Sequence, residues 1–420
     1  MKPIRVAVIG AGDRGNIYGD YALQFPNQLQ VVAVAEPDQA RRNRFSEKHS
    51  LSRDLSFETW NDLFSRPRLC DALIITTQDQ QHYEPVMKAL AKGYHLLVEK
   101  PLSPSLQECE EMISAAEESH SIFMLCYVLR YTPFFQKIKD IIQEGILGEI
   151  RHVALDMNVA YWHQAHSYVR GNWRSSQQSS PMIMAKCCHD FDILSYLIKR
   201  DCQRLSSFGH LSHFRPDQAP PGSTLRCTDG CAIEPGCPYS ALRLYLGDNT
   251  GWPVSTISTD SSLEARKKAI EEGPFGRCVY HCDNDVVDHQ VVHLEFEDHI
   301  TATLTMSAFT DELSRTIRIL GTKGELEGHM KKNELTVRPF GRPSQSITVA
   351  PSAFGQHSGG DFGLIQHFVQ QLQGKGLGPS ERPHDLLSSH ILSWAAEESR
   401  LSGRMIEIQD LRRPGQLLKR

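Results

Sequence analysis

The stretch IRVAVIGAGDRG, residues 4–15, decides the fold of this chain. An apolar run typical of a buried β-strand passes directly into a turn with the pattern G-x-G-x-x-G, whose glycines stand at positions 10, 12 and 15. In this pattern one glycine allows a tight turn, one lets the backbone approach a pyrophosphate, and one lets a helix pack closely on the strand. The unpaired N–H groups at the start of that helix attract an anion. The stretch therefore predicts a strand, turn and helix that bind a dinucleotide.

A second apolar run, residues 29–35, ends at Glu36. Dinucleotide-binding folds place a carboxylate about 20 residues beyond the glycines, where it accepts hydrogen bonds from the adenosine ribose. Such a carboxylate repels the 2′-phosphate of NADP, so the sequence predicts NAD as the cofactor. Arg41 and Arg42 follow one helical turn later and favour NADP, which stays open as the less favoured choice. A glycine-rich turn without a ligand is the alternative for the triplet alone, and the flanking strands and acid argue against it.

The composition suits a globular protein of two domains, because 420 residues exceed the usual size of one domain. The net charge of −5 and the pI near 6.4 give no basic surface for nucleic acid. No apolar run reaches the roughly 20 residues that span a bilayer. The first strand begins at residue 4, which leaves no room for a signal peptide before it. We therefore expect a cytoplasmic protein in which most of the 11 cysteines are thiols or metal ligands rather than disulfides.

Short apolar runs alternate with helical segments up to about residue 125, and the rhythm then changes. Residues 1–125 predict an α/β Rossmann domain with a doubly wound parallel sheet. Residues 126–420 predict an α+β domain built on an open, mainly antiparallel sheet, which binds the substrate and offers a surface for a homo-oligomer. The strands expected in the first domain are 5–9, 30–35, 72–76, 95–98 and 122–126, and the helices expected along the chain include 85–92, 105–119, 133–143 and 189–198.

The second domain contains one stretch without periodicity, about residues 203–285, which is rich in Pro, Gly, Ser and Cys. Because unstructured stretches of this length are rare in compact domains, we expect a functional or separately cross-linked insertion there. Later in the chain, Asp361 is expected to cap a helix. The alternative for this region is that His357 reaches the substrate pocket.

Five short motifs are spread along the chain: TQDQQH at 77–82, EKP at 99–101, RYTP at 130–133, GILG at 145–148 and HDFD at 189–192. Together they resemble the Gfo/Idh/MocA family of sugar and inositol dehydrogenases. The resemblance covers nearly the whole chain apart from the insertion. It implies a two-domain NAD-dependent oxidoreductase that transfers a hydride between nicotinamide and a hydroxyl carbon of a sugar, sugar acid or cyclitol.

The chain also departs from the family pattern. In many members an aspartate stands four residues before the histidine, where this chain has Ala185. The identity of the proton acceptor is therefore open. Some members use NAD in a redox cycle that cleaves a glycosidic bond without net oxidation, so an NAD-dependent glycoside hydrolase is the alternative function. A non-catalytic NAD-sensing or scaffold protein is disfavoured because Lys100 and His189 are both present.

The glycine-rich turn and the resemblance together define the expected cofactor site. Its residues are Gly10, Gly12, Asp13, Arg14, Gly15, Glu36, Thr77, Gln78, His82, Glu99, Lys100 and Arg130. Lys100 directly follows a predicted parallel strand, at the carboxyl edge where open α/β sheets bind ligands. The resemblance implies that it is the active-site lysine, whose ammonium polarises a substrate oxygen. The alternative is a surface lysine paired with Glu99.

His189 is the expected general base, because an imidazole titrates near neutral pH and accepts a hydroxyl proton there. Without the resemblance, a histidine near the start of a helix is more often a cap or a core residue. Asp192 follows one helical turn later. It either orients the ring or pairs elsewhere in the core, and the second interpretation is slightly favoured.

Aromatic and basic residues between positions 161 and 174 lie where the family places its substrate loop. Aromatic faces stack on sugar rings, and guanidinium groups bind carboxylates or phosphates in a forked geometry. The expected substrate-binding residues are Lys100, Tyr161, His163, Arg170, Trp173, Arg174, Lys186 and His189. The cations suggest a substrate with an acidic group. The alternative is that Arg170 and Arg174 lie on a solvated loop or at a subunit interface.

The insertion contains a cluster of cysteines, with His281 beside the last of them. Thiolates and imidazoles are the usual ligands of structural zinc, and such a site would order a segment with little apolar content. We expect a zinc site formed by Cys227, Cys231, Cys237 and Cys282, with Cys278 and His281 as further candidate ligands. Disulfides and unlinked buried thiols are the alternatives.

Overall fold

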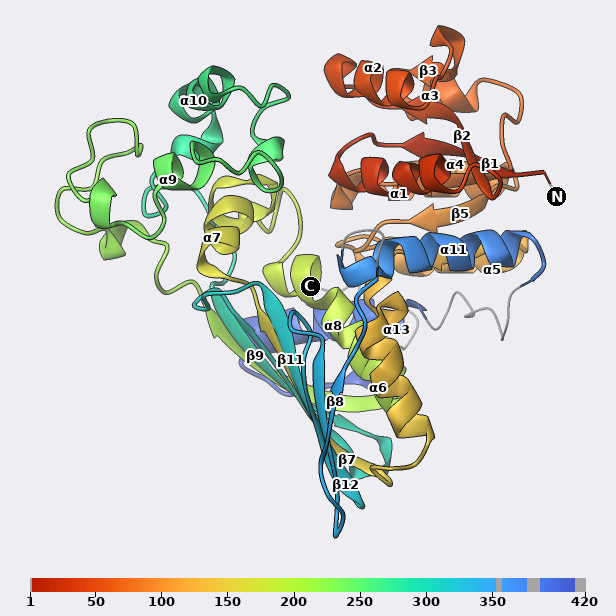
Figure 1. Ribbon diagram of the computed structural model, residues 1–420, viewed down its shortest axis with the longest axis vertical. Helices are drawn as coiled ribbons and strands as arrows, with labels where there is room; N and C mark the ends of the chain where they lie inside the picture. Colours follow the sequence, from red (N-terminus) through yellow and green to blue (C-terminus); the bar gives the residue numbers. More distant parts are fainter. Residues whose placement is uncertain (1, 353–356, 376–385, 412–420) are drawn as a thin grey trace. The chain divides into compact units, whose positions relative to one another are not determined.

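The computed structural model describes residues 2–352, 357–375 and 386–411 (Figure 1). The chain divides into two compact units. The first contains Met1–Glu144, Phe191–Leu197 and Val349–Leu392, and the second contains Gly145–Asp190, Ile198–Thr348 and Ser393–Arg420. Each unit is therefore built from three separate stretches of the chain.

A six-stranded sheet forms the centre of the first unit. Its order is β3-β2-β1-β4-β5-β6, and every pair of strands is parallel. The strands are β1 (Ile4–Ile9), β2 (Leu29–Ala35), β3 (Ser56–Phe57), β4 (Ala72–Ile75), β5 (His95–Val98) and β6 (Phe123–Leu125). This order confirms the predicted doubly wound sheet. The order in which the chain adds strands to the sheet reverses between β1 and β4. Sheets of this type bind ligands at the carboxyl ends of the strands next to this reversal.

The helices of the first sheet are α1 (Asp13–Gln24), α2 (Gln39–Lys48), α3 (Trp60–Phe64), α4 (Tyr83–Ala91), α5 (Leu106–Ser119) and α6 (Pro133–Gln143). Polar side chains cap several of them, and the Ser105 hydroxyl accepts from the Glu108 N–H at the start of the helix predicted at 105–119. Helix α1 begins differently. Its N-cap is Gly12, which has no side chain to accept from the first N–H groups of the helix.

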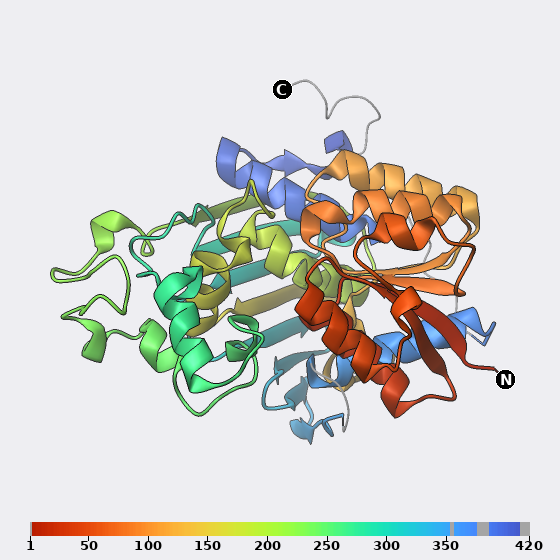
Figure 2. The same ribbon diagram turned by 90° about the horizontal axis from the view of Figure 1, so that it is seen from above.

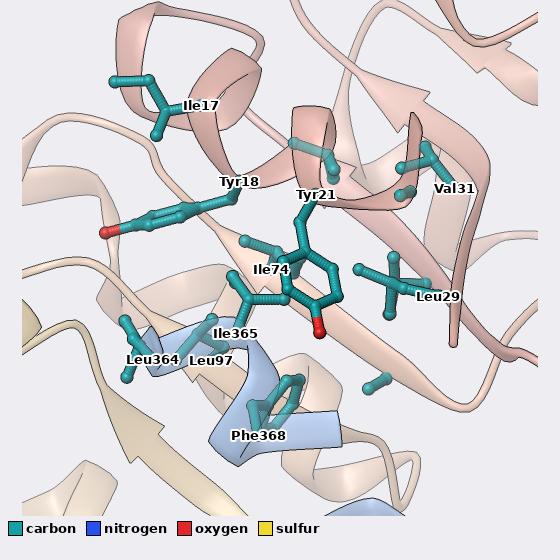
Figure 3. Packing of buried hydrophobic residues seen from close by; sticks show 14 of the residues in the cluster. Ile17, Tyr18, Tyr21, Leu29, Val31, Ile74, Leu97, Leu364, Ile365 and Phe368 are labelled. Atoms are coloured by element: carbon teal, nitrogen blue, oxygen red, sulfur yellow. The ribbon is translucent and has the colours of Figure 1, made fainter. Parts of the chain in front are cut away.

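Helix α11 (Gly360–Leu372) belongs to the first unit although it lies late in the chain (Figure 1). It packs against α1, and the two helices share one core with the sheet. Figure 3 shows this core, to which α1, β4, β5 and α11 contribute Tyr18, Tyr21, Ile74, Leu97, Leu364, Ile365 and Phe368. Burying one such side chain stabilises a fold by about 1.5–3 kcal/mol, so α11 is an integral part of the first unit.

Asp361 does not cap this helix, which corrects the prediction. The N-cap is Gly359, and Asp361 lies inside the first turn of α11. Its fully buried carboxylate forms an ion pair with the Arg14 guanidinium. Burial alone would raise the pKa of Asp361, but Arg14 and His357 outweigh it and lower the pKa to about 2. An ion pair between distant parts of the chain replaces the local cap.

The second unit is built on a nine-stranded sheet with the order β14-β13-β12-β11-β7-β10-β9-β8-β15. The pair β10 and β7 is parallel and the other pairs are antiparallel, which confirms the predicted open, mainly antiparallel sheet. The strands are β7 (Ile150–Asn158), β8 (Cys202–His210), β9 (His289–Phe296), β10 (Thr301–Ser307), β11 (Ser314–Gly321), β12 (Gly324–His329), β13 (Glu334–Pro339), β14 (Gln345–Thr348) and β15 (Ile406–Glu407). Alternate residues of β7 are buried, as in a sheet with one covered face.

The insertion between β8 and β9 forms short helices, among them α9 (Ala241–Tyr245) and α10 (Leu263–Glu272). It is drawn in green at one end of the strands of the second unit (Figures 1 and 2). The insertion begins after His210 rather than near Gln203, because β8 occupies the intervening residues. The sequence did not reveal this strand since small or polar residues such as Ser207 and Gly209 fill inward positions where apolar residues were expected.

Helix α13 (Ser388–Ser402) begins in the first unit and places His390 in its core. The side chain is 1 % exposed, and its Nε2 accepts the Leu102 N–H at 2.7 Å. Its Nδ1 lies 3.0 Å from the Tyr127 hydroxyl. Burial, with smaller contributions from His82 and Lys100, lowers the pKa of His390 from 6.5 to about 4. The neutral ring therefore holds the backbone just beyond Lys100.

We predict that His390 makes the stability of the first unit pH-dependent. The imidazole of His390 is protonated below about pH 6.5 in the unfolded chain but only below about pH 4 in the folded protein. The free energy of unfolding is therefore highest above pH 6.5 and falls as the pH drops from 6.5 to 4. The loss attributable to His390 is on the order of 3 kcal/mol by pH 4. Denaturant unfolding at pH 7 and pH 4.5 should show a smaller pH effect in His390→Gln than in the wild type. The exposed His210→Gln variant is the control. An equal change in the free energy of unfolding between the two pH values in all three proteins would contradict the assignment.

Candidate functional site

The glycine-rich turn is packed at two glycines and open at the third. Gly10 has a φ of +95°, and a Cβ there would lie 2.7 Å from the Thr76 carbonyl oxygen. A Cβ on Gly15 would lie only 2.0 Å from the Gly10 carbonyl oxygen. Nothing lies within 4 Å of the corresponding position on Gly12, which is the N-cap of α1. The turn thus leaves open space beside the start of a helix, as the pyrophosphate of a dinucleotide requires.

Glu36 lies beside this turn at the end of β2. The residue is 6 % exposed, and its Oε2 accepts the Ala11 N–H at 2.7 Å while its Oε1 accepts the Asp38 N–H at 3.0 Å. The Arg42 guanidinium donates to the backbone carbonyls of Glu36 and Pro37. The carboxylate is therefore oriented next to the glycines, where a ribose would follow the pyrophosphate, and a cation lies on the same turn. These residues fit NAD.

Arg14 ties the turn to the rest of the first unit. Its Nε donates to Glu99 Oε1 at 2.7 Å, and its Nη2 donates to Asp361 Oδ1 at 2.5 Å. The Tyr18 hydroxyl, one helical turn further along α1, donates to the same Glu99 oxygen at 2.6 Å. Burial acts to raise the pKa of Glu99, but Arg14, Lys100 and Tyr18 bring it below its usual value. Arg14 and Glu99 therefore hold each other's side chains in place beside the turn. Asp13, the first residue of α1, is exposed.

Three turns meet at the carboxyl edge of this sheet, those that follow β1, β4 and β5. The Thr76 hydroxyl donates to the Gly10 carbonyl at 2.6 Å. The buried His82 ring joins the other two turns, because its Nε2 lies 3.1 Å from the Thr77 carbonyl and its Nδ1 lies 2.9 Å from the Pro101 carbonyl. Gln78 is exposed on the middle turn. The structure therefore brings the predicted residues of these turns to one edge.

Lys100 lies on the third of these turns. It is partly buried, its N–H donates to Glu99 Oε2 at 2.8 Å, and the Lys100–Pro101 peptide is cis. The Glu99 carboxylate itself forms an ion pair with Arg14.

Arg130 lies in the 3-10 turn Val128–Tyr131, which follows β6. Its guanidinium forms a forked ion pair with Asp192, with Nε to Oδ2 at 2.7 Å and Nη2 to Oδ1 at 2.5 Å. It also lies over the rings of Tyr127 and Tyr196. These contacts favour a structural role for Arg130. Asp192 is thus paired with Arg130.

His189 lies in the middle of α8 (Met182–Ile198), not near its start. The helix begins seven residues earlier than predicted. The prediction missed its first turns because they are buried on nearly all sides and show no apolar periodicity. Ala185 and Lys186 precede His189 by four and three residues, so the three side chains share one face of the helix. Lys186 therefore occupies this face next to the position where an aspartate was expected. Asp190 is bound by Arg315 of β11.

The aromatic and basic segment is mostly buried within the second unit. Tyr161 and Trp173 are partly exposed, and the His163 ring packs 4.9 Å from the Trp252 ring. Arg174 forms an ion pair with Asp283. Arg170 is 0 % exposed and donates to backbone carbonyls of the insertion. Both earlier interpretations of Arg170, a ligand for a substrate anion and a residue on a solvated loop or subunit interface, require exposure that this side chain does not have.

Four cysteines of the insertion line one cavity, namely Cys227, Cys231, Cys237 and Cys278. Cys282, which was the expected fourth zinc ligand, is not among the residues that line it, and its Sγ donates to the Cys278 carbonyl. The described cysteines are free thiols. Among the described residues, no three His, Cys, Asp or Glu side chains are grouped closely enough to bind one metal ion. The search of these residues also finds no helix long and apolar enough to cross a membrane.

Two family models match the chain. The NAD-binding Rossmann fold of the GFO_IDH_MocA oxidoreductase family matches residues 4–127, and the C-terminal alpha/beta domain of the same family matches residues 139–381. The chain belongs to the Gfo/Idh/MocA family of oxidoreductases. Membership of this family confirms the resemblance found in the sequence motifs.

Individual relatives are distant. The putative oxidoreductase YteT of Bacillus subtilis is 24 % identical over 368 residues, which is 82 % of each chain. The 2,7-anhydro-N-acetylneuraminate hydratase of Escherichia coli is 26 % identical over 219 residues, 51 % of this chain and 55 % of the hydratase. The NAD⁺ complex of an inositol dehydrogenase homologue from Azotobacter vinelandii has a similar fold, with a TM-score of 0.70, 17 % identity and 97 % coverage of both chains.

We predict that Gly12→Ala and Gly15→Ala have different effects. A methyl group on Gly12 enters open space and should leave the melting temperature unchanged while weakening NAD binding by about tenfold or more, because it occupies the place of the pyrophosphate. A methyl group on Gly15 collides with backbone and should destabilise the fold itself. Calorimetry with NAD and thermal unfolding of both variants separate the two effects. Unchanged NAD affinity in a folded Gly12→Ala protein would argue against the site.

We also predict that Glu36 selects the cofactor. Replacement by Gln removes the negative charge but keeps the size of the side chain, so Glu36→Gln should bind NAD several-fold more weakly and NADP more tightly than the wild type. Affinities for both dinucleotides, measured at fixed ionic strength, provide the comparison. Glu47→Gln, at an exposed position on α2, serves as the control for loss of one carboxylate. A wild type that prefers NADP would contradict the role assigned to Glu36.

Proposed function

We propose that this protein is an NAD-dependent oxidoreductase that transfers a hydride between nicotinamide and a hydroxyl carbon of a sugar, sugar acid or cyclitol. The observation that carries the proposal is the arrangement at the carboxyl edge of the first sheet. There the open Gly12 turn, the Glu36 carboxylate and the turn that carries Lys100 are joined by Thr76, Arg14 and His82. The inositol dehydrogenase homologue among the solved structures and the sugar-related names among the relatives support a carbohydrate substrate.

The residues divide the work between binding and proton transfer. The Gly12 turn and the start of α1 bind the pyrophosphate, and Glu36 accepts hydrogen bonds from the ribose. Bound nicotinamide supplies the acceptor for the hydride that leaves the substrate C–H bond. The Lys100 ammonium stabilises the substrate oxygen while its charge develops. His189 takes the hydroxyl proton. The alcohol thus loses one hydride to nicotinamide and one proton to His189, and becomes a carbonyl compound.

The proposal includes an acidic group on the substrate. The cation that supports this part of the proposal is Lys186. The Arg170 and Arg174 guanidinium groups bind groups within the second unit. Lys186 shares a helix face with His189, so a substrate anion bound there would lie next to the proposed base. We also propose that the open sheet of the second unit takes part in a homo-oligomer.

A redox-neutral reaction is the second candidate, either hydration or glycoside hydrolysis. Two relatives are named 2,7-anhydro-N-acetylneuraminate hydratases, one from Escherichia coli and one from Mediterraneibacter gnavus. In such a reaction the hydride is returned within the same cycle, so that water is added or a glycoside is cleaved without net oxidation. The same Lys100 and His189 would serve it. The two candidates therefore differ in the fate of the hydride and not in the residues.

We predict that a mixed panel of sugars, sugar acids, cyclitols and glycosides incubated with NAD will distinguish them. Net accumulation of reduced nicotinamide, followed by its absorbance, indicates a dehydrogenase. Product formation without that signal indicates the redox-neutral reaction. Neutral and acidic versions of the same sugar test the anion hypothesis, which equal turnover would exclude. No turnover of the panel despite tight NAD binding would favour a non-catalytic protein.

With a substrate in hand, Lys100→Ala and His189→Asn should each lower kcat by about 10²–10⁴-fold, as expected for groups that stabilise charge or transfer a proton. His189→Asn should also remove the limb of the pH–rate profile near neutrality. Lys92→Ala and His210→Asn change exposed residues of the same types and are the matched controls. A Lys100→Ala protein that binds NAD and turns over at the wild-type rate would remove Lys100 from the mechanism.

A further inference from the structure

The cysteine-lined cavity of the insertion has no role in the proposed reaction. Its wall contains the Cys227, Cys231, Cys237 and Cys278 side chains, together with Arg170. The cavity has a volume of about 10 Å³, which is about the space that one water-sized species needs. Cys227 belongs to one small apolar core within the insertion, and Cys278 belongs to another that also includes Ala165, Val169 and Ala308 outside it. The cavity therefore lies where the two cores meet.

Backbone N–H groups lie near all four sulfurs. For Cys237 and Cys278 these groups belong to the residues two positions later, Tyr239 and Tyr280 respectively. Cys227 Sγ accepts the Ala241 N–H at 3.5 Å. Cys231 is surrounded by the N–H groups of Thr224, Ile233 and Glu234. Such donors stabilise a thiolate relative to a thiol, so the backbone is arranged for negative charge on sulfur.

Arg170 supplies a second, independent observation. Its buried guanidinium donates through Nε to the Arg277 carbonyl and through Nη2 to the Tyr239 carbonyl, both at 2.7 Å, and Nη2 also lies 3.8 Å from Cys227 Sγ. Nη1 is buried without a hydrogen-bond partner, and the hydrogen-bond partners given for this arginine among the described residues are backbone carbonyls and a sulfur rather than carboxylates. A buried cation is costly unless negative charge lies close to it. Anionic sulfur in the cavity would provide that charge.

A divalent cation would hold the sulfurs in this anionic form, because it displaces the thiol protons and holds the thiolates together.

We propose that Cys227, Cys231, Cys237 and Cys278 bind one Zn²⁺ as a structural tetrathiolate site, with Arg170 as a positioning residue that offsets its charge. Four thiols lose four protons on binding, and the resulting cluster carries a charge of −2, which the Arg170 cation and the N–H donors stabilise. A set of four sulfur ligands favours tetrahedral Zn²⁺. The described side chains are not yet grouped at the spacing of one ion, so binding draws the four thiols towards the cavity. This site cross-links the two small cores and does not depend on the proposed function.

Metal analysis of the full-length protein, purified without a chelator, tests the proposal. We expect about one zinc per chain, and four fewer thiols that react with a thiol reagent before chelation than after it. Replacing zinc by Co²⁺ should give the absorption bands of a tetrahedral thiolate site. A protein without zinc, with these thiols reactive and no cobalt bands, would overturn the proposal, as would iron or a disulfide at these cysteines.

Variants identify the ligands. The variants Cys227→Ser, Cys231→Ser, Cys237→Ser and Cys278→Ser should each lower the zinc content and the melting temperature, whereas Cys282→Ser and Cys202→Ser should retain both. Arg170→Gln should weaken zinc binding about 10–100-fold in competition with a chelator, as expected for a group that acts through the ligands. If the ligand variants do not fold, the zinc and cobalt measurements on the wild type still decide the question. Zinc lost from Cys282→Ser but kept by Cys278→Ser would contradict the assigned ligand set.

Discussion

The close approach of Gly15 to the Gly10 carbonyl is the constraint on which the first unit depends. With a Cβ only 2.0 Å from that oxygen, no side chain can be accommodated, and α1 could not start where it does. The position of α1 in turn brings Arg14 and Tyr18 to Glu99, and Glu99 to the turn that carries Lys100. One steric requirement near the start of the chain thus determines the geometry of residues about eighty positions later.

The parts of the fold that rest on local signals were predictable from the sequence. The parallel strands, the glycine turn, Glu36 and the Ser105 cap all follow from short stretches whose meaning does not depend on distant residues. Buried elements without periodicity were not predictable. The first turns of α8 are apolar on nearly all sides, and β8 has small or polar residues at inward positions, so neither shows the pattern that reveals amphipathic elements.

The candidate site was predictable to the same extent. The residues of the three turns after β1, β4 and β5 were found because motifs mark them, whereas the long-range partners of these residues were not. Asp361 and His390 join the site through chain separations that no spacing rule addresses. Arg170 shows a different limit, because a guanidinium suited to a substrate anion is equally suited to buried carbonyls and sulfur. Only its burial distinguishes the two environments. The spacing of Tyr18 after Arg14 was the one local sign of the Glu99 network.

The participation of α11 in the first unit affects how the protein is made. A ribosome releases the six parallel strands long before it releases Leu364, Ile365 and Phe368, which cover Tyr18 and Tyr21 in the finished core. During that interval the nascent dinucleotide-binding fold has an uncovered apolar surface, and Asp361, one of the two carboxylates that bind Arg14, has not yet been synthesised. Completion of this unit is therefore a late event in translation. Such an interval is when a chaperone can bind the growing chain.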